Sequence, residues 1–312
     1  METIFIKHPI EANEYKQRTV MALGFFDGVH KGHQLVIEQA KREADASDVP
    51  LSVMTFYPHP LEVLRPGNER MNVITSLPDK IQYLQQLGVD YLYVIEFSIP
   101  FSRLTPQQFV DDYLRSLEVI HVVAGFDFTY GAMGKGNMKT LIDHAHRQFN
   151  VTTVEKLSEN NEKISSTRIR KLIVDGEVEH AAHLLSRAYV IKGIVSDGEK
   201  RGRQIGFPTA NIAIREPYTI PKVGVYAVEF IVDQKKHEGV CNIGYKPTFH
   251  AEREKLSIEV HLFNFDQSIY GKEVEVRWLK RIRDEQKFSN VNELVSQITK
   301  DKQTAEAFFA NR

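Results

Sequence analysis

The sequence has very little cysteine, no long apolar run and almost no net charge. Its 312 residues include one cysteine, Cys241, so no disulfide can form within the chain and a reducing compartment is expected. No apolar run approaches the length of a membrane span, and the first residues lack the basic segment and apolar core of a secretion signal. A net charge of −1 provides no general attraction for nucleic acid or an anionic membrane. We therefore expect a cytoplasmic protein that binds neither nucleic acid nor membranes.

The distribution of apolar residues predicts two domains of different class. Apolar runs over 51–56, 91–97, 119–124 and, more weakly, 151–157 alternate with helical segments, which indicates a parallel sheet with helices on both faces. After about Ser186, alternating strands without helices suggest a small closed antiparallel barrel, and a terminal helix is expected from about Ser289. The fold class is thus α/β followed by β, and we expect domains over 1–185 and 186–312.

A glycine turn followed by two histidines is the most informative motif. Gly24, Gly28 and Gly32 recur every four residues between an apolar run and an amphipathic segment, which predicts a strand, a tight turn and a helix. The N–H groups of a helix start bind anions, and His30 and His33 lie three residues apart, so both rings can face one side. We expect Gly24, Asp27 and Gly28 to contact a nucleotide and the histidines to stabilise charge at phosphorus.

Other interpretations of this motif fit the sequence less well. Paired histidines on a helix are often surface residues or half of a metal site, but no cysteine or acidic ligand stands at metal spacing nearby. The dinucleotide pattern of alternating glycines is absent, and the stretch 131–136 fails the P-loop test because Gly136 stands where Ser or Thr must bind Mg²⁺. The motif therefore favours histidine-assisted nucleotidyl transfer.

Three further motifs in the first domain are expected near this turn. His59 lies between two prolines at a strand end after Phe56, although such a segment is also typical of a rigid loop. Asp127 stands in an aromatic segment suited to a planar ligand with polar edges, although a core cluster explains the aromatic residues equally well. Hydroxyls and an arginine begin a helix at Ser166, Thr167 and Arg170, as phosphate contacts or as ordinary caps.

The second domain carries motifs suited to phosphate transfer. Gly198, Lys200 and Gly202 lie in a basic, glycine-rich segment that is either a flap over phosphates or a solvated hairpin tip. Thr209 and Asn211 share one face of an extended chain and offer hard oxygen ligands for Mg²⁺. Glu259 lies on the polar face of a strand, where it is either a general base or a solvated side chain.

Together these segments resemble the bacterial bifunctional riboflavin kinase/FAD synthetase family. The resemblance rests on five segments. They are the glycine turn with its two histidines at 24–33, called the histidine turn from here on, the segment 164–170, Phe-Pro-Thr-Ala-Asn at 207–211, Ser-Ile-Glu-Val-His at 257–261 and the segment 281–288. It implies a Rossmann-like nucleotidyltransferase domain and a riboflavin kinase barrel. Riboflavin would be phosphorylated to FMN with Mg²⁺ and ATP, and FMN would then be adenylylated to FAD with release of pyrophosphate.

The resemblance also assigns roles to individual residues. Glu259 would be the kinase base, and Thr209 would be the principal metal ligand, with Asn211 beside it. His30, His33, Ser166, Thr167 and Arg170 would contact the second ATP, while Phe56, His59 and Asp127 would lie toward FMN. The alternative is a non-catalytic flavin-binding or nucleic-acid-binding regulator on the same fold. The sequence contains paired histidines, a Thr/Asn pair with oxygen ligands suited to a metal ion, and a strand carboxylate. This combination favours the enzyme over the regulator.

Overall fold

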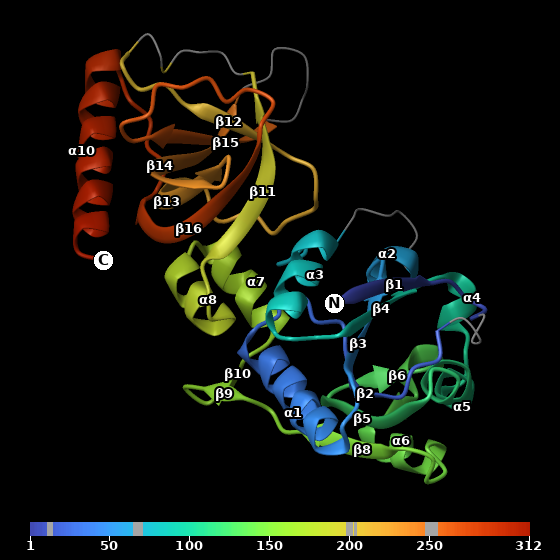
Figure 1. Ribbon diagram of the computed structural model, residues 1–312. Helices are drawn as coiled ribbons and strands as arrows, with labels where there is room; N and C mark the ends of the chain where they lie inside the picture. Colours follow the sequence, from blue (N-terminus) through green and yellow to red (C-terminus); the bar gives the residue numbers. More distant parts are fainter. Residues whose placement is uncertain (11–14, 65–70, 198–201, 203–204, 247–254) are drawn as a thin grey trace. The chain divides into compact units, whose positions relative to one another are not determined.

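The structure, a computed structural model, describes residues 1–10, 15–64, 71–197, 202, 205–246 and 255–312. It divides into two compact units, Met1–Ser166 and Thr167–Arg312, and each is described by itself (Figure 1). None of the helices in these described ranges is both long and apolar enough to cross a membrane.

The first unit is built on a six-stranded sheet in which every neighbouring pair is parallel. In spatial order the strands are β1 (Glu2–Ile6), β4 (Tyr91–Glu96), β3 (Leu51–Tyr57), β2 (Thr19–Leu23), β5 (Val119–Gly125) and β8 (Asn150–Val154). The expected parallel sheet is confirmed. The edge strand β1 was not expected, because Thr3, Ile4 and Phe5 form too short a run to stand out from sequence.

Helices cover both faces of this sheet. On one face, α1 (Lys31–Ser47) and α3 (Leu77–Gln86) bury Val36, Ile37 and Leu84 against it. On the other face, the core takes residues from α4 (Ile99–Ser102), α5 (Pro106–Phe109), the π-helical turn η2 (Val110–Arg115) and α6 (Met138–His144). Thr105 and Gln108 form a capping box at the start of α5. Shorter elements of this unit are α2 (Pro60–Leu64), β6 (Thr129–Tyr130), η3 (Ala132–Gly134), β7 (Gly136–Asn137), β9 (Ser158–Glu159) and β10 (Glu162–Lys163).

The second unit contains a closed antiparallel barrel, as expected. Its strands follow the order β11 (Tyr189–Ser196), β12 (Ala210–Ile214), β15 (Lys255–Leu262), β14 (Lys235–Lys246), β13 (Gly224–Val232) and β16 (Glu273–Arg283). The barrel closes because β16 pairs with both β11 and β13. Alternate strand residues fill the interior, and Val260, Val276 and Trp278 are fully buried there.

The expected terminal helix is α10 (Val291–Ala310), capped at its start by Asn290, and it runs along one side of the barrel (Figure 1). Its Ala305 belongs to a buried cluster with Val225, Ala227, Val240 and Phe263. A buried ion pair adds to this contact, since Arg283 Nη2 on β16 lies 2.7 Å from Asp301 Oδ2 on α10.

Two helices precede the barrel and pack with it. The second unit includes nearly all of α7 (Ser166–Asp175) and the whole of α8 (Val178–Leu185), and α8 contacts β11 and β16. The amide of Lys222 donates to the carbonyl of Ile173, 3.3 Å away, which ties α7 to the same unit. The division into compact units thus falls after Ser166, whereas the element pattern of the sequence suggested a boundary after Leu185.

Candidate active sites

The histidine turn lies at the topological switch point of the first unit. It follows β2, which pairs with β3 on one side and with β5 on the other, and the sheet continues outward in both directions from there. Ligands of open parallel sheets bind at the carboxyl ends of strands where the strand order reverses. The position of the turn therefore suits a ligand site.

The backbone of this turn is strained. Phe26 and Val29 have positive φ angles of 54° and 42°, and Gly28 has a φ of 88°. Positive φ is unusual for an aromatic residue and a genuine outlier for a β-branched one, at a cost of roughly 1–3 kcal/mol each. Such strain persists only where surrounding contacts hold it, and it is concentrated at functional sites.

Asp27 supplies many of those surrounding contacts. Its carboxylate is 1% exposed and accepts hydrogen bonds from the amides of Ile74 and Thr75 at 3.0 and 3.1 Å. The amide of Gly28 donates to Thr75 Oγ1 over 2.5 Å, and the Ser166 hydroxyl donates to the Asp27 carbonyl over 2.8 Å. The carboxylate of Asp27 thus faces the segment 74–75, where it holds the turn in shape.

The two histidines are stacked at the start of α1. Their ring centroids are 3.6 Å apart with an interplanar angle of 17°. His30 is the N-cap residue, and its Nδ1 accepts a hydrogen bond from the His33 amide over 3.2 Å. An accepting Nδ1 leaves Nε2 as the protonated ring nitrogen, so His30 is a neutral donor while it caps the helix.

The flanking glycines provide space. A β-carbon on Gly32 would lie 3.2 Å from Cε1 of His30, and one on Gly24 would lie 3.0 Å from the tip of the Phe26 ring. Gly28, by contrast, adopts a backbone conformation that favours glycine. Gly24 and Gly32 are therefore needed to leave room for the Phe26 and His30 rings, and Gly28 is needed for its positive φ angle.

Lys80 is a residue of this site that sequence reasoning overlooked. It is 4% exposed, and its Nζ donates to the carbonyl of Phe25 over 2.7 Å and to Thr55 Oγ1 over 3.3 Å. Burial lowers the pKa of Lys80 to about 8, against the opposing effect of the Asp27 charge. The sequence feature that could have identified Lys80 is its position inside the apolar stripe formed by Leu77, Ile81 and Leu84.

The residues expected toward a flavin lie at the ends of β3 and β5. The His59 ring meets Phe25 of the turn edge to face, with centroids 4.4 Å apart, and its Nδ1 accepts from the Leu61 amide. Phe56 is partly buried and packs against Phe101 of the core. Asp127 is half exposed and forms an ion pair with Lys163. Thr167 and Arg170 lie on α7 in the second unit.

The barrel brings the expected kinase residues together. Asn211 on β12 pairs in register with Glu259 on β15, and Thr209 precedes β12 directly. The Thr209 hydroxyl donates to Glu259 Oε2 over 3.3 Å, while the Ser257 hydroxyl donates to Oε1 over 3.4 Å. Both oxygens of the carboxylate are thus oriented by neutral hydroxyl groups.

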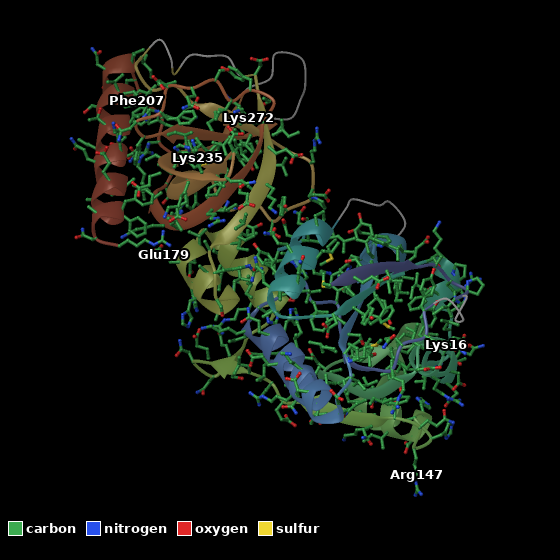
Figure 2. The ribbon with its side chains drawn as sticks, viewed as in Figure 1. Lys16, Arg147, Glu179, Phe207, Lys235 and Lys272 are labelled. Carbon is green, nitrogen blue, oxygen red and sulfur yellow. The ribbon has the colours of Figure 1, made fainter. Side chains whose placement is uncertain are left out.

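The glycine-rich segment before Thr209 is described in part. Gly198 and Lys200 lie outside the described residues. The carbonyl of Gly202 accepts from the Phe207 amide over 2.8 Å, and a β-carbon on Gly202 would lie 3.6 Å from Thr209 Oγ1. Phe207, labelled in Figure 2, packs its ring against His261 with centroids 5.3 Å apart. Gly202 therefore lies close to Thr209.

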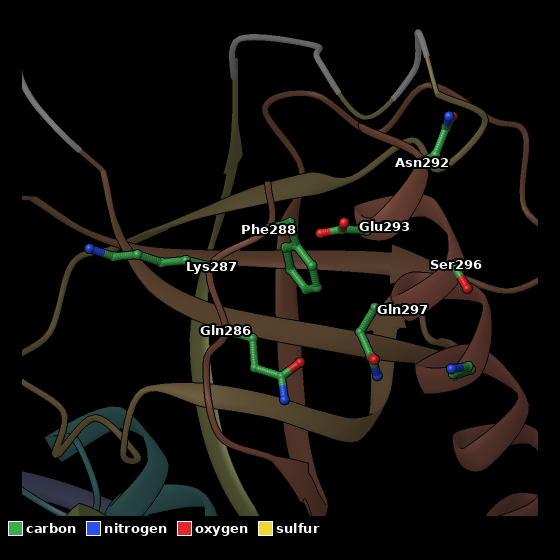
Figure 3. Close-up of a pocket in the computed structure, with 8 residues that line it drawn as sticks. Gln286, Lys287, Phe288, Asn292, Glu293, Ser296 and Gln297 are labelled. Atoms are coloured by element: carbon green, nitrogen blue, oxygen red, sulfur yellow. The ribbon is translucent and has the colours of Figure 1, made fainter. Parts of the chain in front are cut away.

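A cavity of about 620 Å³ lies between the segment after β16 and the first turns of α10. Figure 3 shows the side chains of Phe288 and Glu293 directed toward one another across it, whereas Lys287 extends away. The Gln297 amide donates to Asp301 Oδ1 over 2.9 Å. Glu285 immediately precedes Gln286 of the cavity lining. Its side chain lies against Gly244, since a β-carbon on Gly244 would be 2.5 Å from Glu285 Oε1, and Gly244 pairs in register with Ser257.

The two halves of the chain match two protein families, and full-length relatives combine both. The FAD synthetase family matches residues 12–168, and the riboflavin kinase family matches residues 185–309. The bifunctional riboflavin kinase/FMN adenylyltransferase of Bacillus subtilis is 51% identical over 313 residues, covering 100% of this chain and 99% of that protein. The enzymes of the same name from Listeria monocytogenes and Escherichia coli K12 are 49% and 37% identical, covering 99% and 93% of this chain and 99% and 92% of their own lengths.

A solved structure of a Streptococcus pneumoniae protein, named there as a macrolide-efflux protein, has the same fold throughout. It superposes with a TM-score of 0.90 at 36% identity, covering 98% of this chain and 99% of that one. The resemblance noted in the sequence is confirmed by the full-length relatives. The chain belongs to the bifunctional riboflavin kinase/FMN adenylyltransferase family.

Proposed function

We propose that the turn between β2 and α1 carries out FMN adenylylation and that Thr209, Asn211 and Glu259 carry out riboflavin phosphorylation. As a member of its family, the chain is a transferase with both activities, forming FMN and then FAD. The regulator considered above is therefore the weaker interpretation. The observation that carries the first assignment is the stacked histidine pair on a strained turn. The second rests on the contact between Thr209 and Glu259.

In adenylylation, an FMN phosphate oxygen attacks the α-phosphorus of ATP, and the bond to the β-phosphate breaks to release pyrophosphate. Negative charge grows on the α- and β-phosphate oxygens as this happens. The His30 Nε2–H and the first amides of α1 are preorganised donors for that charge, and His33 is stacked beside His30. Gly24 and Gly28 are the proposed backbone contacts of the phosphates. Ser166, Thr167 and Arg170 are the further ATP contacts, and Phe56, His59 and Asp127 are the FMN contacts.

In phosphorylation, Glu259 accepts the proton of the ribityl 5′-hydroxyl while that oxygen attacks the γ-phosphorus of ATP, and ADP leaves. The Thr209 and Ser257 hydroxyls orient the carboxylate for this role. Since the Thr209 hydroxyl directs its hydrogen at Glu259, its lone pairs are turned away from the carboxylate. Gly198, Lys200 and Gly202 would cover the phosphates.

These residues fit a magnesium ion held jointly with the nucleotide. The Thr209 hydroxyl and the Asn211 amide offer oxygen donors, which Mg²⁺ prefers. Within the described parts of the chain no group of three or more His, Cys, Asp or Glu side chains is arranged to hold a metal. ATP phosphates and water would therefore supply the other ligands. When bound, Mg²⁺ would neutralise phosphate charge during transfer.

The cavity beside α10 is the proposed site for the riboflavin ring system. Its lining combines the Phe288 ring with the polar side chains of Gln286 and Ser296, which suits a planar ligand with polar edges. The first residue of its lining, Gln286, follows Glu285, whose side chain lies against Gly244. Gly244 pairs with Ser257, and the Ser257 hydroxyl donates to Glu259, so a chain of contacts connects this lining with the proposed base.

Variants that separate the two activities test these assignments. Each protein is incubated with Mg²⁺ and ATP plus either riboflavin or FMN, and flavins are separated by chromatography. Glu259→Gln should lower riboflavin phosphorylation roughly 10²- to 10⁴-fold and leave FAD formation from supplied FMN intact. His33→Ala should lower FAD formation about 10- to 100-fold and leave FMN formation intact. The control Glu275→Gln alters another barrel glutamate, one paired with Lys192. Kinase activity of Glu259→Gln within a few-fold of wild type would make Glu259 a solvated strand residue.

A further inference from the structure

A charged lysine is an expensive residue to bury under the histidine turn. Lys80 lies in α3 among Leu77, Ile81 and Leu84, where an apolar side chain would serve packing better. An ammonium loses its hydration when it is buried, and this costs several kilocalories per mole unless polar partners compensate. The partners of Lys80 therefore indicate what the charge is for.

Those partners are Phe25, which belongs to the histidine turn, and Thr55 of β3, which also donates to the Phe25 carbonyl. Lys80 Nζ and the Thr55 hydroxyl both donate to the carbonyl of Phe25, at 2.7 and 2.9 Å. The same ammonium lies 4.4 Å from the centroid of the Phe25 ring, a cation–π contact. The Phe25 carbonyl is thereby fixed immediately before Phe26, the first strained residue of the turn.

The charge of Lys80 also acts on Asp27. Asp27 is a buried carboxylate within the turn to which we assign the ATP phosphates. Its electrostatic attraction raises the pKa of Lys80 against the effect of burial, so the cation and the anion compensate one another. Thr55, which approaches from β3, is neutral. Without Lys80, the Asp27 charge would repel an incoming nucleotide.

We propose that Lys80 is a positioning residue for adenylyl transfer, which fixes the Phe25 carbonyl and neutralises Asp27 so that the histidine turn can receive ATP phosphates. This inference rests on the proposed assignment of that turn to adenylyl transfer. Through the Phe25 ring, Lys80 also supports His59, which contacts that ring. Lys80 touches the turn and not the reacting atoms.

The test uses Lys80→Met, which keeps the length of the side chain and removes its charge, and Lys41→Met as a control at an exposed lysine of α1. FAD formation from FMN and riboflavin phosphorylation are measured on the same full-length protein. For Lys80→Met we expect kcat/KM for ATP in FAD formation to fall about 10- to 100-fold, with a higher KM, and kinase activity to stay within two-fold. FAD formation within two-fold of wild type would overturn the proposal.

Two further readouts separate positioning from packing. Adding Asp27→Asn to Lys80→Met removes the uncompensated anion while its Oδ1 can still accept from Ile74 and Thr75, so the KM for ATP should partly recover. A double variant with no recovery contradicts charge compensation. In the wild type, FAD formation should decline as the pH rises through about 8, where Lys80 loses its proton. A flat profile there overturns the proposal even if Lys80→Met does not fold.

The failures are distinguishable from one another. If His33→Ala still forms FAD at the native rate, the assignment of the turn itself is wrong. If His33→Ala loses FAD formation and Lys80→Met retains it, the turn is correctly assigned and Lys80 does not position it.

Discussion

His30 has two roles in the structure, and a pair of substitutions separates them. Its Nδ1 caps α1 by accepting the His33 amide, and its Nε2–H is the proposed phosphate donor. His30→Ala removes both functions. His30→Asn restores a side-chain acceptor at the N-cap, because asparagine is among the best residues at that position. The shorter asparagine cannot place a donor where Nε2 stands.

The two losses have different expected magnitudes. Loss of an N-cap acceptor costs about 1 kcal/mol, which lowers the Tm of a unit the size of Met1–Ser166 by about 2–4 °C. Loss of a hydrogen bond to a charged phosphate costs about 1.5–3 kcal/mol, or roughly 10- to 150-fold in rate. His30→Ala should show both effects. His30→Asn should recover most of the Tm and none of the FAD formation.

The assay is flavin chromatography after incubation with FMN, Mg²⁺ and ATP, with thermal melting followed in parallel. Riboflavin phosphorylation by the same proteins reports on the integrity of the second unit. His146→Asn makes the same chemical change at an exposed histidine of the first unit and should alter neither activity. If His30→Asn forms FAD at the wild-type rate, His30 is a helix cap only and the proposed phosphate contact is refuted.

Four other predictions concern the second unit. Thr209→Val should lower riboflavin phosphorylation about 10- to 100-fold by removing the hydroxyl that contacts Glu259, and Thr209→Ser should restore most of it; equal kinase rates in both variants would exclude the metal-ligand role. Asp301→Ala should destabilise the second unit by roughly 3–5 kcal/mol in urea unfolding, because it leaves Arg283 charged and largely buried, and an unchanged midpoint would show that the pair contributes nothing. A fragment of residues 167–312 should fold and convert riboflavin to FMN but form no FAD. A fragment of residues 186–312 should melt at a lower temperature, since it lacks Val178 and Leu184, each worth roughly 1.5–3 kcal/mol of burial; equal melting temperatures would favour a boundary after Leu185.

Most elements of the fold can be recognised from local patterns. The strands β3, β4 and β5 coincide closely with apolar runs, and α3 has Pro78 in its first turn and Gly88 just beyond its end. These patterns succeed because hydrophobic periodicity and capping act between residues that are near in sequence. The stacking of His30 on His33 has the same origin, since residues three apart meet on one helix face.

Other features depend on contacts between residues far apart in the chain. Thr209 meets Glu259 across fifty residues because β12 pairs with β15 in one register. Asp27 and Lys80 hold the histidine turn only because α3 packs on the same sheet face as α1. The glycine spacing indicated flexibility at Gly28 but gave no sign of strain at Phe26 and Val29.

The helices that precede the barrel show the same limit. α7 and α8 follow a β/α pattern and so read as part of the first domain, yet α8 packs its apolar residues against β11 and β16. A helix presents the same amphipathic stripe to any partner, so its periodicity reveals that it is buried and not against which element. Which partner buries it depends on the barrel closing beside it, which the residues of the helix do not encode.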